Sequence, residues 1–152
     1  RGINMEDELD VYKVSVRHLI DVVGNPFEGA LWTYRPISEG LVQKVLERNE
    51  FETRFSPDDD THVPEGVVSK RLYYAKRIAY FCLHGDPTPL IIECGECVRL
   101  LDGWHRLSAA VFMNKDDKMI DVTYDGYEDN FHYLFPEAKN PLCRPARQRK
   151  MR

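Results

Sequence analysis

The 152-residue sequence has no hydrophobic run approaching the roughly 18 residues that a membrane helix requires. It also has no charged start leading into an apolar signal segment, and no internal repeat. These absences argue against a membrane span, a secretory leader and a repeat architecture. We therefore expect a soluble, cytoplasmic protein that does not enter the membrane.

Cysteine is scarce, at four residues, and only Cys94 and Cys97 form a C-x-x-C pair. A structural zinc site needs four ligands, yet the sequence offers no second cysteine pair and no closely spaced pair of histidines. A redox C-x-x-C usually starts a helix, whereas strand-like runs flank this pair on both sides. We expect two ordinary hairpin cysteines, and the pattern leaves any further function open.

The composition that is present fits one globular domain. Hydrophobic residues make up 43% of the chain and charged residues 30%, which is enough apolar material for a core. The net charge of −4 is unevenly spread, with an excess of bases in residues 61–115 and 144–152 and an excess of acids elsewhere. A polyanion would therefore meet the central block and the terminal tail.

Hydrophobic periodicity and turn residues predict an alternation of strands and helices, which is typical of an α+β fold. The predicted strands are 11–17, 90–93, 97–101 and 119–124, and the predicted helices are 39–48, 67–84, 104–113 and 127–135. We expect a single domain over residues 11–143. Residues 1–10 are expected to be a disordered or cloning-derived start, and residues 144–152 a basic tail.

Two predicted helices carry apolar faces that indicate how they pack. Ser38 is expected to cap the helix 39–48, which would bury Leu41, Val45 and Leu46. In the helix 67–84 the residues Val68, Leu72, Ala75, Ala79 and Cys82 recur at helical spacing and predict one buried stripe. Basic residues and tyrosines lie off that stripe.

The segment from Asp102 to Arg106 has the strongest chemical signal, because a strand runs into an Asp-Gly turn and then at once into a helix. Gly103 can adopt backbone angles that bring the chain close to a ligand. The first amides of a helix are unpaired and favour an anion, yet His105 and Arg106 also lie in this first turn. A phosphate between these two side chains would explain the arrangement. The alternative is a plain helix start in which Asp102 caps, His105 packs and Arg106 pairs with a surface carboxylate.

The motif Asp102-Gly103-Trp104-His105-Arg106, with the following R-L-x-A-A pattern, resembles the core of the ParB/sulfiredoxin superfamily over residues 67–124. The resemblance implies a small mixed sheet with helices packed on it, binding ATP or CTP with Mg²⁺. It implies phosphate contacts from Gly103, His105 and Arg106, and from Ser69, Lys70 and Arg71 at the start of the preceding helix. It further implies Asp102 and His105 as catalytic residues that hold or move a proton.

Two departures narrow what the resemblance implies. Sulfiredoxins carry a catalytic cysteine where this chain has Trp104, so repair of sulfinic acid is excluded unless another thiol takes its place. The given sequence also shows no helix-turn-helix-sized segment after the core, so we do not expect a complete partition protein. The expected function is ATP hydrolysis with DNA binding or DNase activity, as in plasmid- or phage-encoded relatives that block DNA transfer or host defence. A non-catalytic protein- or DNA-binding module that retains the phosphate site and a small-molecule kinase remain as alternatives.

Nucleic acid is the second expected partner, through two basic regions. Lys76 and Arg77 lie beside Tyr73 and Tyr74, whose rings are candidates for stacking on bases. The tail adds a cluster of cations, namely Arg144, Arg147, Arg149 and Lys150. Both regions also fit a solvated surface.

The metal ligands are undetermined. Asp58, Asp59 and Asp60 are candidates for binding Mg²⁺, although a run of acidic residues like this one is more often a solvated turn. The sequence does not predict an oligomeric state.

Overall fold

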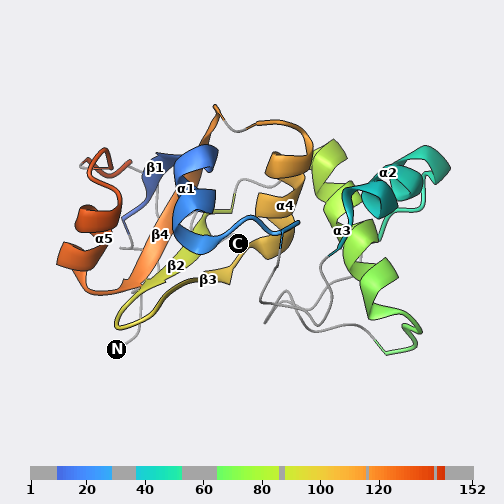
Figure 1. The fold of residues 1–152 in the computed structure, drawn as a ribbon, viewed down its shortest axis with the longest axis horizontal. Coiled ribbons are helices and arrows are strands. Elements are labelled where there is room, and N and C mark those ends of the chain that lie inside the picture. The colour runs from blue at the N-terminus through green and yellow to red at the C-terminus, as the bar shows by residue number, and fades with distance from the viewer. Residues whose placement is uncertain are drawn as a thin grey trace.

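The chain forms a mixed α/β structure, which a computed structural model describes for residues 10–28, 37–52, 65–85, 88–115, 117–138 and 140–142. A four-stranded sheet and five helices make up this described part, as the α+β prediction requires (Figure 1). In chain order the elements are β1 (Tyr12–Ser15), α1 (Val16–Val23), α2 (Glu39–Arg48), α3 (Lys70–His84), β2 (Leu90–Cys94), β3 (Val98–Asp102), α4 (Trp104–Phe112), β4 (Met119–Gly126) and α5 (Glu128–Leu134).

The sheet is mixed, with the strand order β1-β4-β2-β3. β4 pairs antiparallel with β1 and parallel with β2, so that Val122 lies opposite both Tyr12 and Leu90. β2 and β3 form an antiparallel hairpin whose register shifts between Ile91 and Ile92. The shift lies opposite the end of β3 that leads into α4.

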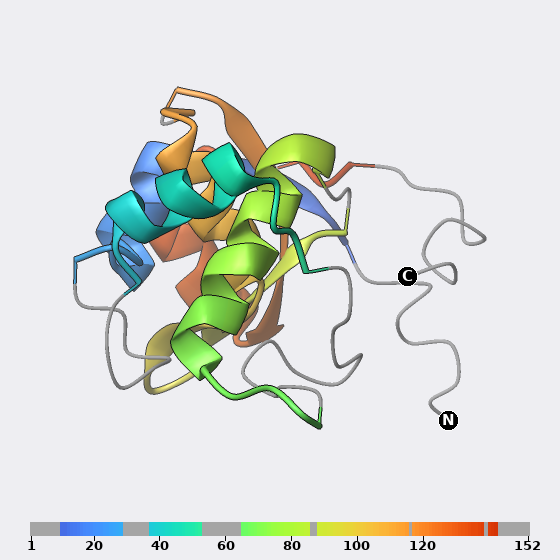
Figure 2. The same cartoon turned by 90° about the vertical axis from the view of Figure 1, so that its right-hand side faces the viewer.

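α4 lies between the sheet and α3, and α2 covers the far side of α3 (Figures 1 and 2). The two sides of α4 therefore belong to different apolar clusters. Leu107 and Val111 pack with the sheet, α1 and α5, whereas Ala109 packs with α2 and α3. Residues of α4 are thus held from both sides, which fixes the position of the turn that precedes it.

The first predicted strand is too long, because β1 ends at Ser15 and not at residue 17. The Ser15 side chain accepts a hydrogen bond from the backbone amide of His18 at 3.0 Å and so caps α1, a helix that the sequence analysis missed. The alternation of Val14 and Val16 is typical of a strand, and both residues are buried. Val14 lies in β1, however, and Val16 is the first residue of α1.

The bounds of α2 agree with the prediction, and Ser38 caps it as expected, accepting from Leu41 at 3.1 Å. Its fully buried residues are Val42 and Val45, whereas Leu41 and Leu46 are only partly buried.

The predicted stripe of α3 is wrong at its start. The helix begins at Lys70 after the cap Ser69, so Val68 precedes it and is fully exposed, and Leu72 is 37% exposed. Ala75 and Ala79 are buried as predicted. Five further residues of α3 are also buried, namely Tyr73, Tyr74, Arg77, Ile78 and Phe81. A helix between two layers buries a broader face than one stripe, and this explains the difference.

No helix in the part of the chain that the structure describes is long and apolar enough to cross a membrane. Most of the predicted start and all of the predicted tail, residues 144–152, lie outside the described residues.

Candidate functional site

The turn between β3 and α4 is built around Gly103, which has the left-handed backbone angle φ = 111°. A Cβ atom at this position would lie 2.5 Å from Cγ of Leu90 and 3.3 Å from Nη2 of Arg106. Only glycine fits such an angle and such a contact without strain. The sequence predicted a close approach to a ligand at this glycine. The described side chain that it approaches is that of Leu90 in β2.

Arg106 is held rigidly at the first turn of α4, with its side chain only 10% exposed. Its Nη1 donates to the carbonyl oxygen of Thr88 at 2.6 Å and to that of Pro89 at 3.4 Å. Its Nη2 donates to Oδ2 of Asp102 at 3.1 Å, and Asp102 is 37% exposed. Asp102 is thus the partly exposed partner of a largely buried guanidinium.

The sequence predicted that His105 faces a ligand at the surface. In the structure it does not. It is 2% exposed and packs against Tyr74, with ring centroids 5.2 Å apart. Burial, and then the charges of Arg77 and Arg106, lower the pKa of His105 to about 3. The imidazole is therefore neutral near pH 7. In this conformation it is a core residue, and the geometry does not support a phosphate contact or a proton-transfer role for it.

Ser69, Lys70 and Arg71 lie at the opposite end of α3 from Arg106. The Ser69 hydroxyl caps the helix, accepting from the amide of Leu72 at 3.1 Å, and Lys70 and Arg71 are exposed. Arg106 instead binds Thr88, just beyond the carboxyl end of α3. Since α3 has 15 residues and rises about 1.5 Å per residue, the two groups are separated by most of its length. The structure therefore does not bring the three residues at the start of α3 together with Gly103 and Arg106.

The predicted nucleic-acid face of α3 is also largely internal. Arg77 is 4% exposed, donates to the carbonyl oxygen of Glu52 at 3.0 Å and lies over the ring of Phe81 at 4.6 Å. Tyr73 and Tyr74 are buried in the cluster with α2, so these rings cannot stack on bases. Lys76 is partly exposed. The predicted contacts Arg144, Arg147, Arg149 and Lys150, and the candidate metal ligands Asp58, Asp59 and Asp60, lie outside the described residues.

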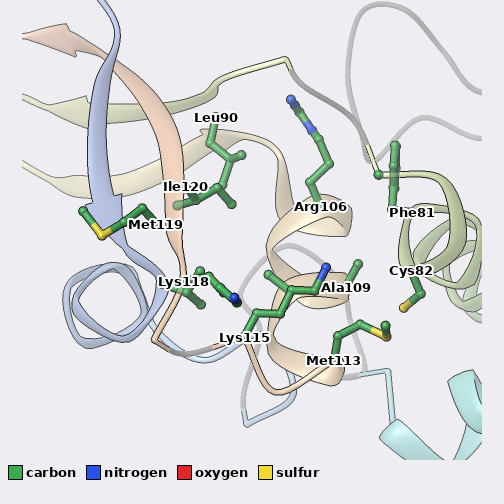
Figure 3. A pocket seen from close by; sticks show the side chains of 13 residues that line it. Phe81, Cys82, Leu90, Arg106, Ala109, Met113, Lys115, Lys118, Met119 and Ile120 are labelled. Carbon is green, nitrogen blue, oxygen red and sulfur yellow. The ribbon is translucent and has the colours of Figure 1, made fainter. Parts of the chain in front are cut away.

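A hollow of about 190 Å³ opens beside Arg106, between the end of α3, one face of α4 and the start of β4 (Figure 3). Its walls are mainly apolar, and three cations line it, Arg106, Lys115 and Lys118. The sequence analysis missed both lysines. Their only sequence signal is a turn with two lysines that leads into a strand, and the hollow exists only once α3, α4 and β4 are assembled.

Burial makes two of the described cysteines poor nucleophiles. Cys94 is buried in β2, whereas Cys97 is exposed in the hairpin turn. Burial raises the pKa of Cys94 to about 11 and that of Cys82, in the wall of the hollow, to about 11 as well. Both thiols are therefore protonated near pH 7. The described residues contain no group of three or more His, Cys, Asp or Glu side chains that could hold a metal ion.

No protein-family model, no curated protein and no solved structure matches the chain. The described residues offer a largely buried guanidinium at the start of a helix, a partly exposed carboxylate beside it and a hollow lined by three cations.

Proposed function

We propose that this chain is a nucleotide-binding protein of the ParB/sulfiredoxin type, with the nucleotide phosphates bound by Arg106 at the first turn of α4. The strand, glycine turn and helix follow one another as that family's motif requires, and Gly103 has the left-handed conformation. The observation that carries the proposal is Arg106, whose side chain is nine-tenths buried and fixed at the helix start.

Local electrostatics support an anion at this turn. The guanidiniums of Arg77 and Arg106 lie close enough to His105 to lower its pKa, so two positive charges flank the first turn of α4. The positive end of the α4 dipole adds to this positive potential. An arriving phosphate would replace the Asp102 carboxylate on Nη2 of Arg106, because a charge-assisted hydrogen bond to phosphate is at least equally strong.

The reaction we propose for the bound nucleotide is ATP hydrolysis, with Asp102 as the base. Once displaced from Arg106, Asp102 would accept a proton from the attacking water. The new bond forms between that water oxygen and the γ-phosphorus, and the bond from the γ-phosphorus to the bridging oxygen breaks, releasing ADP and phosphate. Mg²⁺ would arrive with the phosphates, which supply most of its oxygen ligands.

A second candidate is a non-catalytic module that binds the nucleotide without cleaving it. The state of His105 favours it, because a buried imidazole with a pKa of about 3 cannot transfer protons efficiently near pH 7. Asp102 is then the only acid–base group among Asp102, Gly103, His105 and Arg106, and its role in the isolated protein is to orient Arg106.

Calorimetric titration with ATP–Mg²⁺ and CTP–Mg²⁺ tests the proposal. Arg106→Ala should weaken nucleotide binding by roughly 10- to 100-fold, since it removes charged hydrogen bonds. The matched control is Arg99→Ala, which removes an exposed arginine paired with Glu93 at 2.6 Å and should leave binding unchanged. Unchanged affinity in a folded Arg106→Ala variant would remove the proposal.

The Asp102→Asn variant separates the two candidates. If the chain hydrolyses ATP, this variant should bind ATP about as well as the natural chain and release phosphate at least tenfold more slowly, because the base is lost. Phosphate release by the natural chain at the rate of the buffer alone would favour the non-catalytic module.

A further inference from the structure

We infer that the hollow between α3, α4 and the start of β4 is a binding site for a small amphiphilic anion, a carboxylate or phosphate ester with a short hydrocarbon body. The inference goes beyond nucleotide binding and does not depend on it. It rests on the shape and lining of the hollow and on the two lysines at its mouth, Lys115 and Lys118.

The interior of the hollow suits hydrocarbon. Its walls include Leu90 and Ile120 from neighbouring strands, Ala109 from α4, and the flexible thioethers of Met113 and Met119. Its volume, about 190 Å³, is below the roughly 300–1,000 Å³ of pockets that hold drug-sized ligands. A short chain or a single ring is therefore the appropriate size, and a whole nucleotide is too large.

The two lysines lie in a turn whose backbone is held by hydrogen bonds, and both residues are exposed. The amide of Lys115 donates to the carbonyl oxygen of Ala110 at 2.9 Å, and the amide of Lys118 donates to that of Lys115 at 2.9 Å. The carbonyl oxygen of Lys118 in turn accepts from the amide of Val16 at 3.0 Å. The turn therefore places both side chains at one end of the hollow, opposite the guanidinium of Arg106 (Figure 3).

The charges at the hollow are complementary to an anion. No described residue that lines it is acidic, and neither lysine forms an ion pair with a described residue. Arg106 already donates to Asp102 and Thr88, so the two lysines are the lining cations that have no carboxylate partner among the described residues. An anionic head at the lysines with its hydrocarbon body inside the hollow satisfies both parts of the site.

Calorimetric titration of the full chain with hexanoate, hexyl phosphate and hexylamine tests this assignment. Hexanoate, hexyl phosphate or both should bind, whereas hexylamine should not. The comparison of the two anions identifies the preferred head group. Within the series from butanoate to hexanoate, each added methylene should strengthen binding by about fourfold. Absence of binding by both anions, or equal binding by hexylamine, would overturn the inference.

Three variants locate the site. The double variant Lys115→Gln/Lys118→Gln should weaken binding by roughly tenfold, whereas the exposed α2 control Lys44→Gln should leave it unchanged. Ala110→Met keeps every charge and places a long side chain into the hollow, so it should abolish binding. Binding of natural strength in the double variant and in a folded Ala110→Met would overturn the inference.

Anion binding in the hollow can be told apart from a helix-end effect and from nucleotide binding. Lys115 lies just beyond the carboxyl end of α4, where a cation stabilises a helix. Loss of this stabilisation would lower the unfolding free energy but would not change hexanoate binding. The nucleotide proposal is tested by ATP and Arg106→Ala. Failure of ATP to bind leaves the hexanoate result intact, and failure of hexanoate to bind leaves the ATP result intact.

Discussion

The imidazole of His105 is surrounded by Tyr74 and by the charges of Arg77 and Arg106. Its pKa in the folded chain is about 3, whereas an unfolded histidine has a pKa of about 6.5. Protonation therefore favours the unfolded state, so this residue's contribution to stability is complete above pH 6.5 and is lost as the pH falls toward 3.

This linkage predicts a measurable pH dependence. Between pH 7 and pH 5 the natural chain should lose about 2 kcal/mol more unfolding free energy than His105→Gln, which has no titrating group at that position. Urea unfolding of both chains at the two pH values measures the difference. Equal losses would show that His105 is exposed or charged in the folded protein.

Ser69 has a structural role that can be separated from ligand binding. Because its hydroxyl caps α3, Ser69→Ala should cost about 1 kcal/mol of unfolding free energy, and Ser69→Asp should cost little, since aspartate caps a helix equally well. ATP affinity, measured by calorimetry, should be unchanged in both variants. A loss of ATP binding in Ser69→Asp alone would place a phosphate at this residue after all.

At the same scale, the residue types of the motif singled out a group of neighbouring residues but did not show which way their side chains point. The pattern singled out Asp102, Gly103 and Arg106. Arg106 donates to Asp102 across the turn, and Gly103 lies between them with no room for a Cβ atom. It could not show that His105 is buried, because burial depends on α3 packing against α4. The prediction that Arg77 contacts nucleic acid failed for the same reason. A basic residue on a helix is normally solvated, whereas Arg77 is buried.

At the scale of elements, the turn from β3 into α4 depends on the single glycine at its centre. Gly103→Ala should cost on the order of 1–3 kcal/mol, because alanine combines strain at φ = 111° with a contact to Leu90 that is too short. Gly40→Ala in α2 is the control, since no atom lies within 4 Å of the added Cβ, and it should be neutral or stabilise by up to about 1 kcal/mol. Thermal unfolding distinguishes the two variants, and equal midpoints would contradict this account.

Elements with local signals were predicted well, and elements that depend on tertiary packing were not. Ser38 and the residues after it specify α2 almost by themselves. α1 was missed because Ser15 ends a strand and caps a helix at once, so a strand period simply continues into the first helical turn. The width of the buried face of α3 depends on α2 and α4, which cover it from two sides.

At the scale of the whole molecule, α4 joins two apolar clusters, and the candidate sites lie where it meets α3 and the sheet. The fold class followed from the order of elements, but the strand order β1-β4-β2-β3 did not, because nothing local specifies which strands pair. The hollow was likewise beyond prediction, since its walls come from segments between Val16 and Ile120 that only the assembled fold brings together.

The central claim is that Arg106 at the start of α4 binds phosphate while His105 stays in the core. A crystal structure of the chain with a non-hydrolysable ATP analogue and Mg²⁺ tests it most directly. The account predicts a phosphate oxygen within hydrogen-bond distance of the Arg106 guanidinium, with Asp102 displaced and the His105 ring still packed on Tyr74. A nucleotide bound elsewhere, or held by an outward-turned His105 with the Arg106–Asp102 pair intact, would contradict it.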